Sequence, residues 1–240
     1  MRHMILALIL SLAALPLRAQ DTDLELVLMA DASGSIDPEE LLLQRRGYAQ
    51  AMTDPDVIAA IQNTAYGSIA VTYVEWAANQ AVIVDWTRID GPEAAALFAA
   101  QLDNPLRRAL GRNAIGSALL RGKQLIEEND ITGWRRVIDF SGDSVNNWSG
   151  PSIAEARDAV LAAGITINGL PLMLSDDMGR AATLEANYRD QIIGGPNAFT
   201  LPTVSREDFA AAVRRKLILE ISGLTPETDL ALNATPADQR

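Results

Sequence analysis

The sequence predicts one α/β domain, a three-layer, doubly wound fold whose sheet is mainly parallel with one antiparallel edge strand. Short apolar runs, typical of strands buried on both faces, alternate with segments in which apolar residues recur at helical spacing. Two β-branched and aromatic runs close together predict a hairpin, which would supply the antiparallel edge. The 240 residues, 48% of them hydrophobic, suffice for one buried core.

Residues 1–19 have the features of a secretory signal peptide. Arg2 precedes an apolar run over residues 5–17, and the small residue Ala19 stands before a polar stretch. The run has 13 residues, fewer than the roughly 20 that span a membrane. We therefore expect cleavage after Ala19, export to the periplasm or the medium, and no stable membrane insertion.

The first elements of the domain, which we place over residues 20–222, have clear boundaries. Residues 24–30 (LELVLMA) predict a buried strand that ends in a small polar loop. A helix should begin at Pro38, because Asp37 can cap it and Glu40 has the spacing of a capping box. A second, short helix is expected over residues 56–61.

The middle of the chain predicts a hairpin, two helices and a strand. Residues 69–76 (IAVTYVEW) and 81–86 (AVIVDW) form the hairpin, and the alanine-rich segment 92–102 forms a helix. Residues 136–140 (RVIDF) predict the next strand. The inner face of the helix before this strand is marked by Ile115, Leu119, Gly122 and Ile126.

The last third predicts two helices, two strands and a tail. A helix over residues 153–163 should end at Gly164, where a left-handed residue is favoured. We expect a strand over residues 165–174, a less regular stretch over 175–196 with a rigid turn at 192–196, and a short strand over 199–204. Ser205 and Asp208 should open a last helix, followed by a flexible tail over residues 223–240. The inward stripe of this helix consists of Phe209, Val213, Leu217 and Ile221.

Composition excludes several classes of function. Without residues 1–19, 18 basic and 31 acidic residues leave a net charge of −13, which repels nucleic acids and anionic lipids. There is no cysteine, and the one histidine, His3, lies in the predicted signal peptide. The mature chain thus lacks the imidazole and thiolate that zinc or copper would favour, and it lacks a histidine base for a serine hydrolase.

Three polar clusters lie in loops next to the predicted strands and helices. Asp31, Ser33 and Ser35 follow the first strand, Asn113 precedes a helix, and Asp143 follows the strand over residues 136–140. In this fold class ligands bind beyond the carboxyl ends of the strands, where the strand order reverses. Two acidic loops at that edge would repel each other without a cation.

The donors in these loops are hard oxygens, which suit a magnesium-like ion. Asp31, Ser33 and Ser35 alternate, so a loop that turns sharply at Gly34 can direct a carboxylate and two hydroxyls to one point. Taken alone, this five-residue motif is weak evidence, because a helix-capping loop has the same residue types. Its position at the end of the first buried strand strengthens the metal-site interpretation.

Several other polar and aromatic residues have simpler expected roles. Asp139, within a strand, is expected to be a hydrogen-bonded structural carboxylate, and Glu75 and Trp76 are candidates for the rim of the site. We expect Asn146 and Asn147 to stabilise a turn, Trp86, Trp134 and Trp148 to pack against the core, and Arg214, Arg215 and Lys216 to form a solvated helix face.

The ordered set of motifs resembles the von Willebrand factor A (VWA) superfamily. The pattern is a strand, Asp-x-Ser-x-Ser, a helix, a second polar loop and a later Ser-Gly-Asp loop. More narrowly, LVLMADASGSID, YVEWA, RNAIGSAL, VIDFSGDSVNN, LEANYRDQIIGGPNAF and DFAAAVRRKLILEI resemble a bacterial family of secreted VWA-like proteins of unknown function. The resemblance extends from about residue 24 to about residue 222.

The resemblance implies a metal-ion-dependent adhesion site (MIDAS). The implied ligands of Mg²⁺, or of Mn²⁺ or Ca²⁺, are Asp31, Ser33, Ser35, Asn113 and Asp143, and an acidic residue of a partner protein would complete the coordination. Asn113 stands where the superfamily has threonine. An amide oxygen can also ligate a hard cation, but the side chain is longer and lacks the hydroxyl.

The sequence therefore favours a periplasmic or secreted protein-binding module over an enzyme. The alternative is a VWA-like scaffold with a degenerate, metal-free site that binds partners through its loops or edge strand. An enzymatic role has less support, since a serine nucleophile at Ser144 would have no histidine base and Ser33 replaces the second carboxylate of a phosphatase motif.

Overall fold

The computed structural model describes residues 21–103, 106, 108–173 and 178–233, so the predicted signal peptide lies outside it. In these ranges one sheet has the strand order β3-β2-β1-β4-β5. β1 pairs in parallel with β2 and β4, β4 with β5, and only β3 is antiparallel, at the edge. This confirms the predicted fold class. The strands are β1 (Thr22–Asp31), β2 (Ile69–Trp76), β3 (Gln80–Ile89), β4 (Gly133–Gly142) and β5 (Thr166–Pro171).

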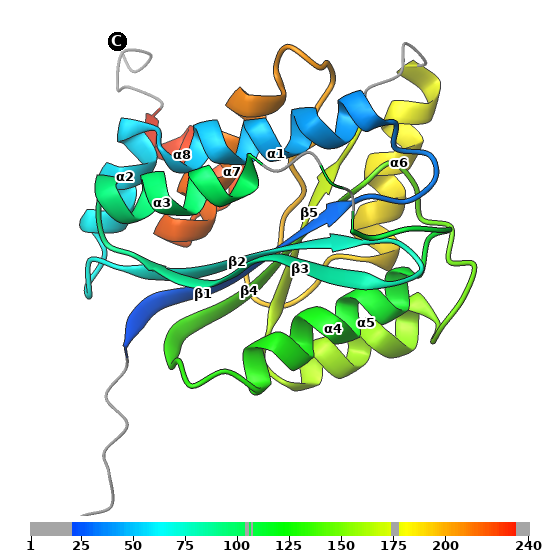
Figure 1. The fold of residues 1–240 in the computed structure, drawn as a ribbon, viewed down its shortest axis with the longest axis horizontal. Helices are drawn as coiled ribbons and strands as arrows, with labels where there is room; N and C mark the ends of the chain where they lie inside the picture. Colours follow the sequence, from blue (N-terminus) through cyan, green and yellow to red (C-terminus); the bar gives the residue numbers. More distant parts are fainter. Residues whose placement is uncertain (1–20, 104–105, 107, 174–177, 234–240) are drawn as a thin grey trace, which may run out of the picture.

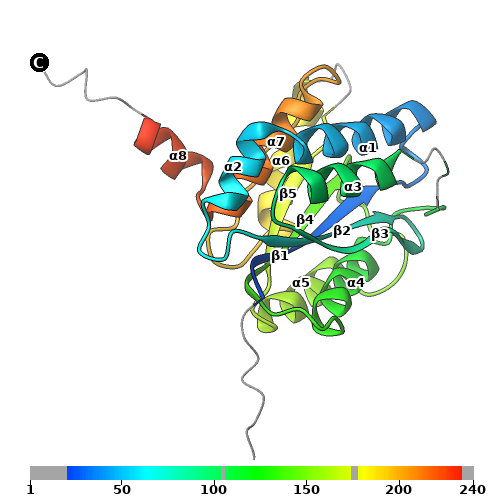
Figure 2. The ribbon, with the colours of Figure 1, turned by 60° about the vertical axis from the view of Figure 1, so that its left-hand side comes forward.

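Helices cover both faces of this sheet. One face carries α1 (Pro38–Met52), α2 (Pro55–Gln62), α3 (Pro92–Leu102) and α7 (Phe209–Ser222), and the other carries α4 (Ile115–Glu127) and α5 (Ile153–Ala162) (Figure 1). Two further helices lie outside these layers: α6 (Met178–Gln191) packs beside β5, and α8 (Pro226–Asn233) projects from the body of the domain (Figure 2).

The core consists of two layers separated by the sheet. Alternate residues of β1 face opposite sides: Leu26 packs with Tyr48 of α1 and Phe209 of α7, whereas Val27 packs with Leu119 of α4. Every residue of β1 is buried. The continuous apolar run that predicted this strand is therefore explained by burial on both faces.

Local signals fix where several helices begin and end. The Asp37 carboxylate accepts a hydrogen bond from the backbone N–H of Glu40 (2.8 Å), and the Glu40 carboxylate accepts one from the N–H of Asp37 (3.1 Å). This confirms the predicted capping box at the start of α1. Gly164, just after α5, has φ +70°, a left-handed conformation that glycine adopts without strain.

The stretch over residues 175–196 is more regular than predicted, because α6 occupies Met178–Gln191. Its alanine, leucine, glutamate and arginine residues favour a helix, but few apolar residues mark an inner face. The turn predicted at 192–196 is present: Gly195 has φ +96°, and Gly194 bridges to Ile167. The segment predicted as a flexible tail contains α8, and its residues 234–240 lie outside the described part.

The short strand predicted over residues 199–204 is not a regular strand. The segment runs beside β5 and forms two isolated parallel bridges, Gly169 with Thr200 and Leu172 with Thr203. The N–H groups of Leu201 and Thr203 donate to the carbonyls of Gly169 and Pro171, but Pro171 has no N–H to donate in return, so the ladder is interrupted.

The predicted burial is wrong for one lysine and two tryptophans. Lys216, expected on a solvated face, is fully buried, and its ammonium group lies 2.7 Å from Asp139 Oδ1. Trp134 and Trp148, expected to pack against the core, are 64% and 62% exposed. Asp139 is the buried, paired structural carboxylate that was predicted, and the half-buried Trp86 packs against the core as expected.

Candidate metal-binding site

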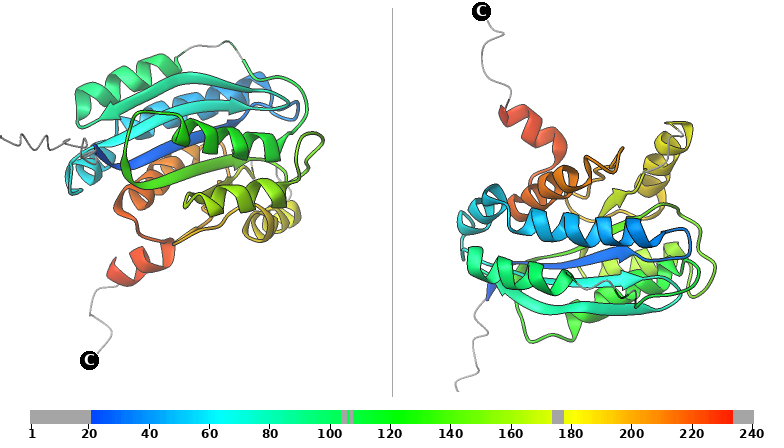
Figure 3. Two further views of the ribbon diagram at one scale, coloured as in Figure 1. Left: turned by 90° about the horizontal axis from the view of Figure 1, so that it is seen from below. Right: turned by 45° about the horizontal axis from the view of Figure 1, so that its top comes forward.

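The site lies where the order of the parallel strands reverses. β1 is the central strand, between β2 and β4, and its carboxyl end lies next to that of β4. The loops after β1 and β4, and the loop before α4, meet at this end of the sheet, which Figure 3 shows from below and in a view tilted so that the top comes forward. The topology thus brings together three loops that are far apart in the sequence.

The loop after β1 gathers three of the predicted ligands. The Asp31 side chain is fully buried, and its Oδ1 accepts a hydrogen bond from the N–H of Ser33 (2.8 Å). The hydroxyl oxygens of Ser33 and Ser35 lie 3.2 Å apart. This turn therefore directs one carboxylate and two hydroxyls to the same side, as the alternating motif predicted.

The end of β4 packs tightly against Asp31. A Cβ atom on Gly142 would lie 2.9 Å from Asp31 Oδ2, from the Trp76 ring and from the Tyr188 hydroxyl. Only glycine allows the two loops this close approach. Tyr188 donates a hydrogen bond to the Gly142 carbonyl (2.9 Å), and the Trp76 ring N–H donates to the Ser141 carbonyl (2.9 Å). Asp143 follows directly and is thereby held beside Asp31.

Two buried carboxylate oxygens of the site have no hydrogen-bond partner in the described part of the chain. They are Asp31 Oδ2 and Asp143 Oδ1. Burial, and then the negative charge of Asp143, raise the pKa of Asp31 to about 7, even though hydrogen bonds from Ser33 and from the backbone of Asp143 lower it. Unpaired buried carboxylates are unfavourable, so this pair of oxygens has the charge and donor chemistry of a cation site.

Asn113, in the loop before α4, reaches the same place. Its side chain is only 7% exposed, and its amide nitrogen donates a hydrogen bond to the Ser144 hydroxyl (2.8 Å). Its backbone carbonyl accepts from the N–H of Trp148 (2.9 Å). Asn147 accepts from the N–H of Gly116 (3.3 Å) and donates to the Pro151 carbonyl, so it stabilises this turn as predicted.

A pocket of about 480 Å³ opens above these residues. Three predicted ligands line it, and Asp31 and Ser33 lie buried beneath it. The structure therefore brings all five predicted residues together around one pocket. Its lining consists of Gly34, Ser35, Arg112, Asn113, Asp143, Ser144, Asn146 and Trp148.

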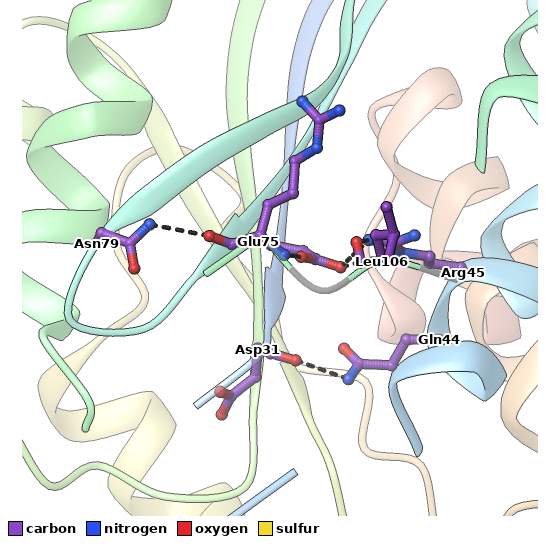
Figure 4. Close-up of polar contacts among 7 residues, drawn as sticks. Asp31, Gln44, Arg45, Glu75, Asn79 and Leu106 are labelled. Atoms are coloured by element: carbon purple, nitrogen blue, oxygen red, sulfur yellow. Dashed lines mark hydrogen bonds and ion pairs between the residues drawn. The ribbon is translucent and has the colours of Figure 1, made fainter. Parts of the chain in front are cut away.

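A network of hydrogen bonds holds Leu106 and the segment 108–113, which leads into the site. The Glu75 carboxylate pairs with Arg45 and accepts from the N–H of Arg108 (2.9 Å), while Arg45 also donates to the Leu106 carbonyl (2.8 Å) (Figure 4). Asn79 accepts from the N–H of Leu110 (2.8 Å) and donates to the Arg108 carbonyl (3.1 Å). We call residues 108–113 the strap.

Glu75 and Trp76 were predicted as candidates for the rim of the site. This prediction is wrong, because both residues are fully buried beneath the site. Glu75 anchors the strap through its ion pair with Arg45, and the Trp76 ring stacks on Phe140 with ring centroids 4.8 Å apart. Both residues support the site from below rather than face a ligand.

Two residues that position the acidic loops, Gln44 and Tyr188, were not predicted from the sequence. Gln44 donates to the Asp31 backbone carbonyl (2.8 Å; Figure 4). It also accepts from the Ser141 hydroxyl (3.3 Å), so one side chain joins the ends of β1 and β4. The signal was available: Gln44 lies at helical spacing between Leu41 and Tyr48, on the buried face of α1. A polar residue on such a face requires a buried partner.

Comparison with solved structures identifies the fold. A pilus adhesin, SpaC from Lactobacillus rhamnosus GG in an open conformation, superposes with a TM-score of 0.61 at 13% identity over 85% of this chain and 30% of the adhesin. The vWF domain of the pilus tip protein Mfa5 from Porphyromonas gingivalis gives 0.55 at 10% identity over 86% and 98%. The chain thus has a VWA fold and matches less than a third of the whole SpaC adhesin.

A third similar structure carries a metal. Proximal thread matrix protein 1 from the mussel byssus, described with a zinc-occupied MIDAS motif, gives a TM-score of 0.56 at 14% identity over 84% of this chain and 46% of that protein. None of the curated proteins matches the sequence. A family of proteins matches residues 21–225. The chain therefore belongs to the family described as "Protein of unknown function (DUF1194)", whose fold here is that of a VWA domain.

Proposed function

We propose that this protein is a metal-dependent protein-binding module whose ion is held by Asp31, Ser33, Ser35, Asn113 and Asp143. The observation that carries the proposal is the pair of buried, unpartnered oxygens, Asp31 Oδ2 and Asp143 Oδ1. A divalent ion would neutralise both carboxylates and offer a coordination position to a carboxylate of the partner. The pocket above the pair gives the partner access.

The donor set favours a hard cation. It combines two carboxylates, two hydroxyls and an amide, which suit Mg²⁺, Mn²⁺ or Ca²⁺. Within the described residues, no three histidine, cysteine, aspartate or glutamate side chains cluster, so the proposed site combines only two carboxylates with neutral oxygen donors. Since a MIDAS motif in the mussel protein holds zinc, zinc is included in the test below.

Binding, rather than catalysis, is the activity that these residues support. A pilus adhesin and a pilus tip protein among the similar structures favour adhesion to another protein. Beyond His3 the chain has neither histidine nor cysteine to activate a nucleophile. We therefore infer no enzymatic activity, and generic ester and phosphate substrates with Mg²⁺ or Mn²⁺ should show no turnover above that of an Asp143→Ala variant.

We propose that the protein acts in the periplasm or outside the cell. The segment over residues 1–19 and the surface location implied by the pilus proteins support export. Within the described part of the chain, every helix is too short or too polar to cross a bilayer.

Calorimetric titration of metal into chelator-stripped mature protein tests the site. We expect one saturable site for Mg²⁺ or Mn²⁺, with Ca²⁺ and Zn²⁺ titrated in parallel. Asp143→Ala should abolish this binding, because it removes one of the two carboxylates. Asp85→Ala, which removes an exposed carboxylate from β3, is the matched control and should bind like the wild type. Equal binding by both variants would overturn the metal site.

A metal-free scaffold is the second candidate, favoured by one observation. The Asn113 amide, in place of the expected threonine hydroxyl, already donates to Ser144. If no ion binds the wild type, partner capture that is indifferent to chelator would support this function instead.

A further inference from the structure

We propose that Arg112 and Trp148 form a second binding position beside the metal, which takes a second carboxylate of the same partner segment. The inference rests on the proposed function and specifies the partner as an acidic segment with two nearby carboxylates. Both residues line the pocket together with Ser35, Asn113 and Asp143. Neither belongs to the proposed set of metal ligands.

The geometry of the pair suits recognition of a carboxylate. The Arg112 guanidinium carbon lies 4.8 Å from the centroid of the Trp148 ring. Such stacking covers a flat face of the guanidinium and leaves its N–H edge available for a bidentate contact. No hydrogen bond or ion pair joins this guanidinium to another described residue. An exposed carboxylate is the natural partner of such an edge.

The pair is held in place before a ligand arrives. The N–H of Trp148 donates to the Asn113 carbonyl (2.9 Å), directly beside Arg112, and the N–H of Gly34 donates to the Gly111 carbonyl (2.9 Å). The loop with Trp148 and the strap with Arg112 are thus joined to each other and to the loop after β1. Preorganisation lowers the entropic cost of binding.

An exposed tryptophan at this position indicates a contact surface. Trp148 is 62% exposed although it belongs to an otherwise ordered turn, and Leu110, two residues before Arg112, is also 62% exposed. Tryptophan and arginine are the residues most enriched at interaction hot spots.

The size and charge of the pocket also suit a second carboxylate. The pocket of about 480 Å³ is within the range of about 300–1,000 Å³ that holds whole small ligands, so it accommodates more than one side chain. Arg112 is the one cationic residue among those that line it, in a chain with a net charge of −11. The metal and Arg112 would thus attract an acidic partner locally, although the surface as a whole repels one.

Binding of model peptides tests the inference. The probes are glycine-serine peptides with blocked ends that contain either one aspartate or two aspartates separated by one, two or three residues. Their dissociation constants are measured by NMR titration at saturating Mg²⁺, or at saturating Mn²⁺ by calorimetry if only Mn²⁺ binds. We expect the best two-aspartate peptide to bind the wild type about tenfold more tightly than the one-aspartate peptide.

Charge-matched variants identify the residue responsible. Arg112→Gln should abolish the tenfold gain and leave metal affinity and one-aspartate binding unchanged. Arg88→Gln removes the same charge from an exposed position at the opposite end of the sheet and should keep the gain. Trp148→Ala should reduce the gain, because the guanidinium would lose its stacking surface.

The outcomes separate this inference from the proposed function. Absence of metal binding in the wild type would overturn both. If metal binds and the second aspartate adds nothing, or if no peptide binds, the two-carboxylate inference is wrong while the metal site stands. An equal loss of affinity for both peptides in Arg112→Gln would also overturn it, because Arg112 would then contact the metal-bound carboxylate.

Discussion

Lys216 is the cation of a buried cluster between the sheet and α7. Its ammonium group contacts the carboxylates of Asp139 and Glu220, and it lies 5.5 Å from the centroid of the Phe199 ring. Burial, and then the charge of Asp139, raise the pKa of Glu220 to about 7, although Lys216 opposes this shift. The lysine therefore offsets the cost of burying two carboxylates between β4 and α7.

Replacement of Lys216 by methionine should destabilise the fold strongly. At pH 8 the variant would leave two buried carboxylates without their cation, so we expect the free energy of unfolding to fall by about 3–5 kcal/mol. The loss should be smaller at pH 5, where the carboxylates can take up protons. Urea unfolding of both proteins at the two pH values measures this difference.

Arg215→Met is the control for the buried lysine. Arg215 lies next to Lys216 on α7, but its ion pair with Asp229 is exposed to solvent. Such pairs contribute about 0–1 kcal/mol, so this variant should unfold nearly like the wild type. A similar loss in both variants would show that the methionine disturbs α7 rather than the charge balance.

At the scale of elements, the strap determines where Asn113 stands. Asn79, in the turn between β2 and β3, is exposed and holds the strap through its hydrogen bonds to Arg108 and Leu110. Asn79→Ala should lower the free energy of unfolding by about 1 kcal/mol. It should also weaken metal affinity by roughly threefold to tenfold, because a looser strap positions its ligand less well.

Calorimetry and amide hydrogen exchange measure these two effects of Asn79→Ala. Faster exchange over residues 108–113 together with weaker metal binding supports a positioning role. Faster exchange with unchanged metal affinity would show that the strap does not position a ligand. Gln80→Ala, which removes one weak hydrogen bond to Ala77 (3.4 Å), is the neighbouring control.

The elements that the sequence predicted well are those whose signals are local. The capping box of α1 and the apolar run of β1 need only neighbouring residues to be recognised. By contrast, α6 was not predicted, because Tyr188 is the main buried residue in the described part of its inner face. A regular strand was predicted over residues 199–204, but Pro171 of β5 has no N–H to complete the ladder with this segment. Lys216 was predicted to be solvated because it lies in a run of three basic residues, which obscured its helical spacing from Val213.

For the whole molecule, topology made the location of the site predictable. A parallel sheet brings the ends of β1 and β4 to one edge, so two polar loops over 100 residues apart could be placed together before the structure was known. The partners of the supporting side chains were not predictable, although the helical spacing of Gln44 indicated that it would be buried. Gln44 and the Arg45–Glu75 pair act through tertiary packing, and no spacing in the sequence indicates which loop a buried side chain will hold.

The stability of the whole domain should depend on metal and pH together. The pKa of Asp31 in the folded, metal-free protein is about 7, above its ordinary value of 3.8. The folded state therefore holds a proton that the unfolded state releases, and the contribution of Asp31 to stability falls as pH rises from about 4 to 7. A bound divalent ion requires the ionised carboxylate, so metal affinity should rise over the same range.

Thermal unfolding with and without Mg²⁺ measures this linkage. At pH 8, with Mg²⁺ at about 100 times its dissociation constant, the ion should add about 2.7 kcal/mol and raise Tm by about 5–10 °C. At pH 5.5 and the same concentration, proton competition should reduce the rise to about 1–3 °C. Asp143→Ala should show no rise at either pH. A rise that is equal at both pH values would mean that the ion binds away from Asp31.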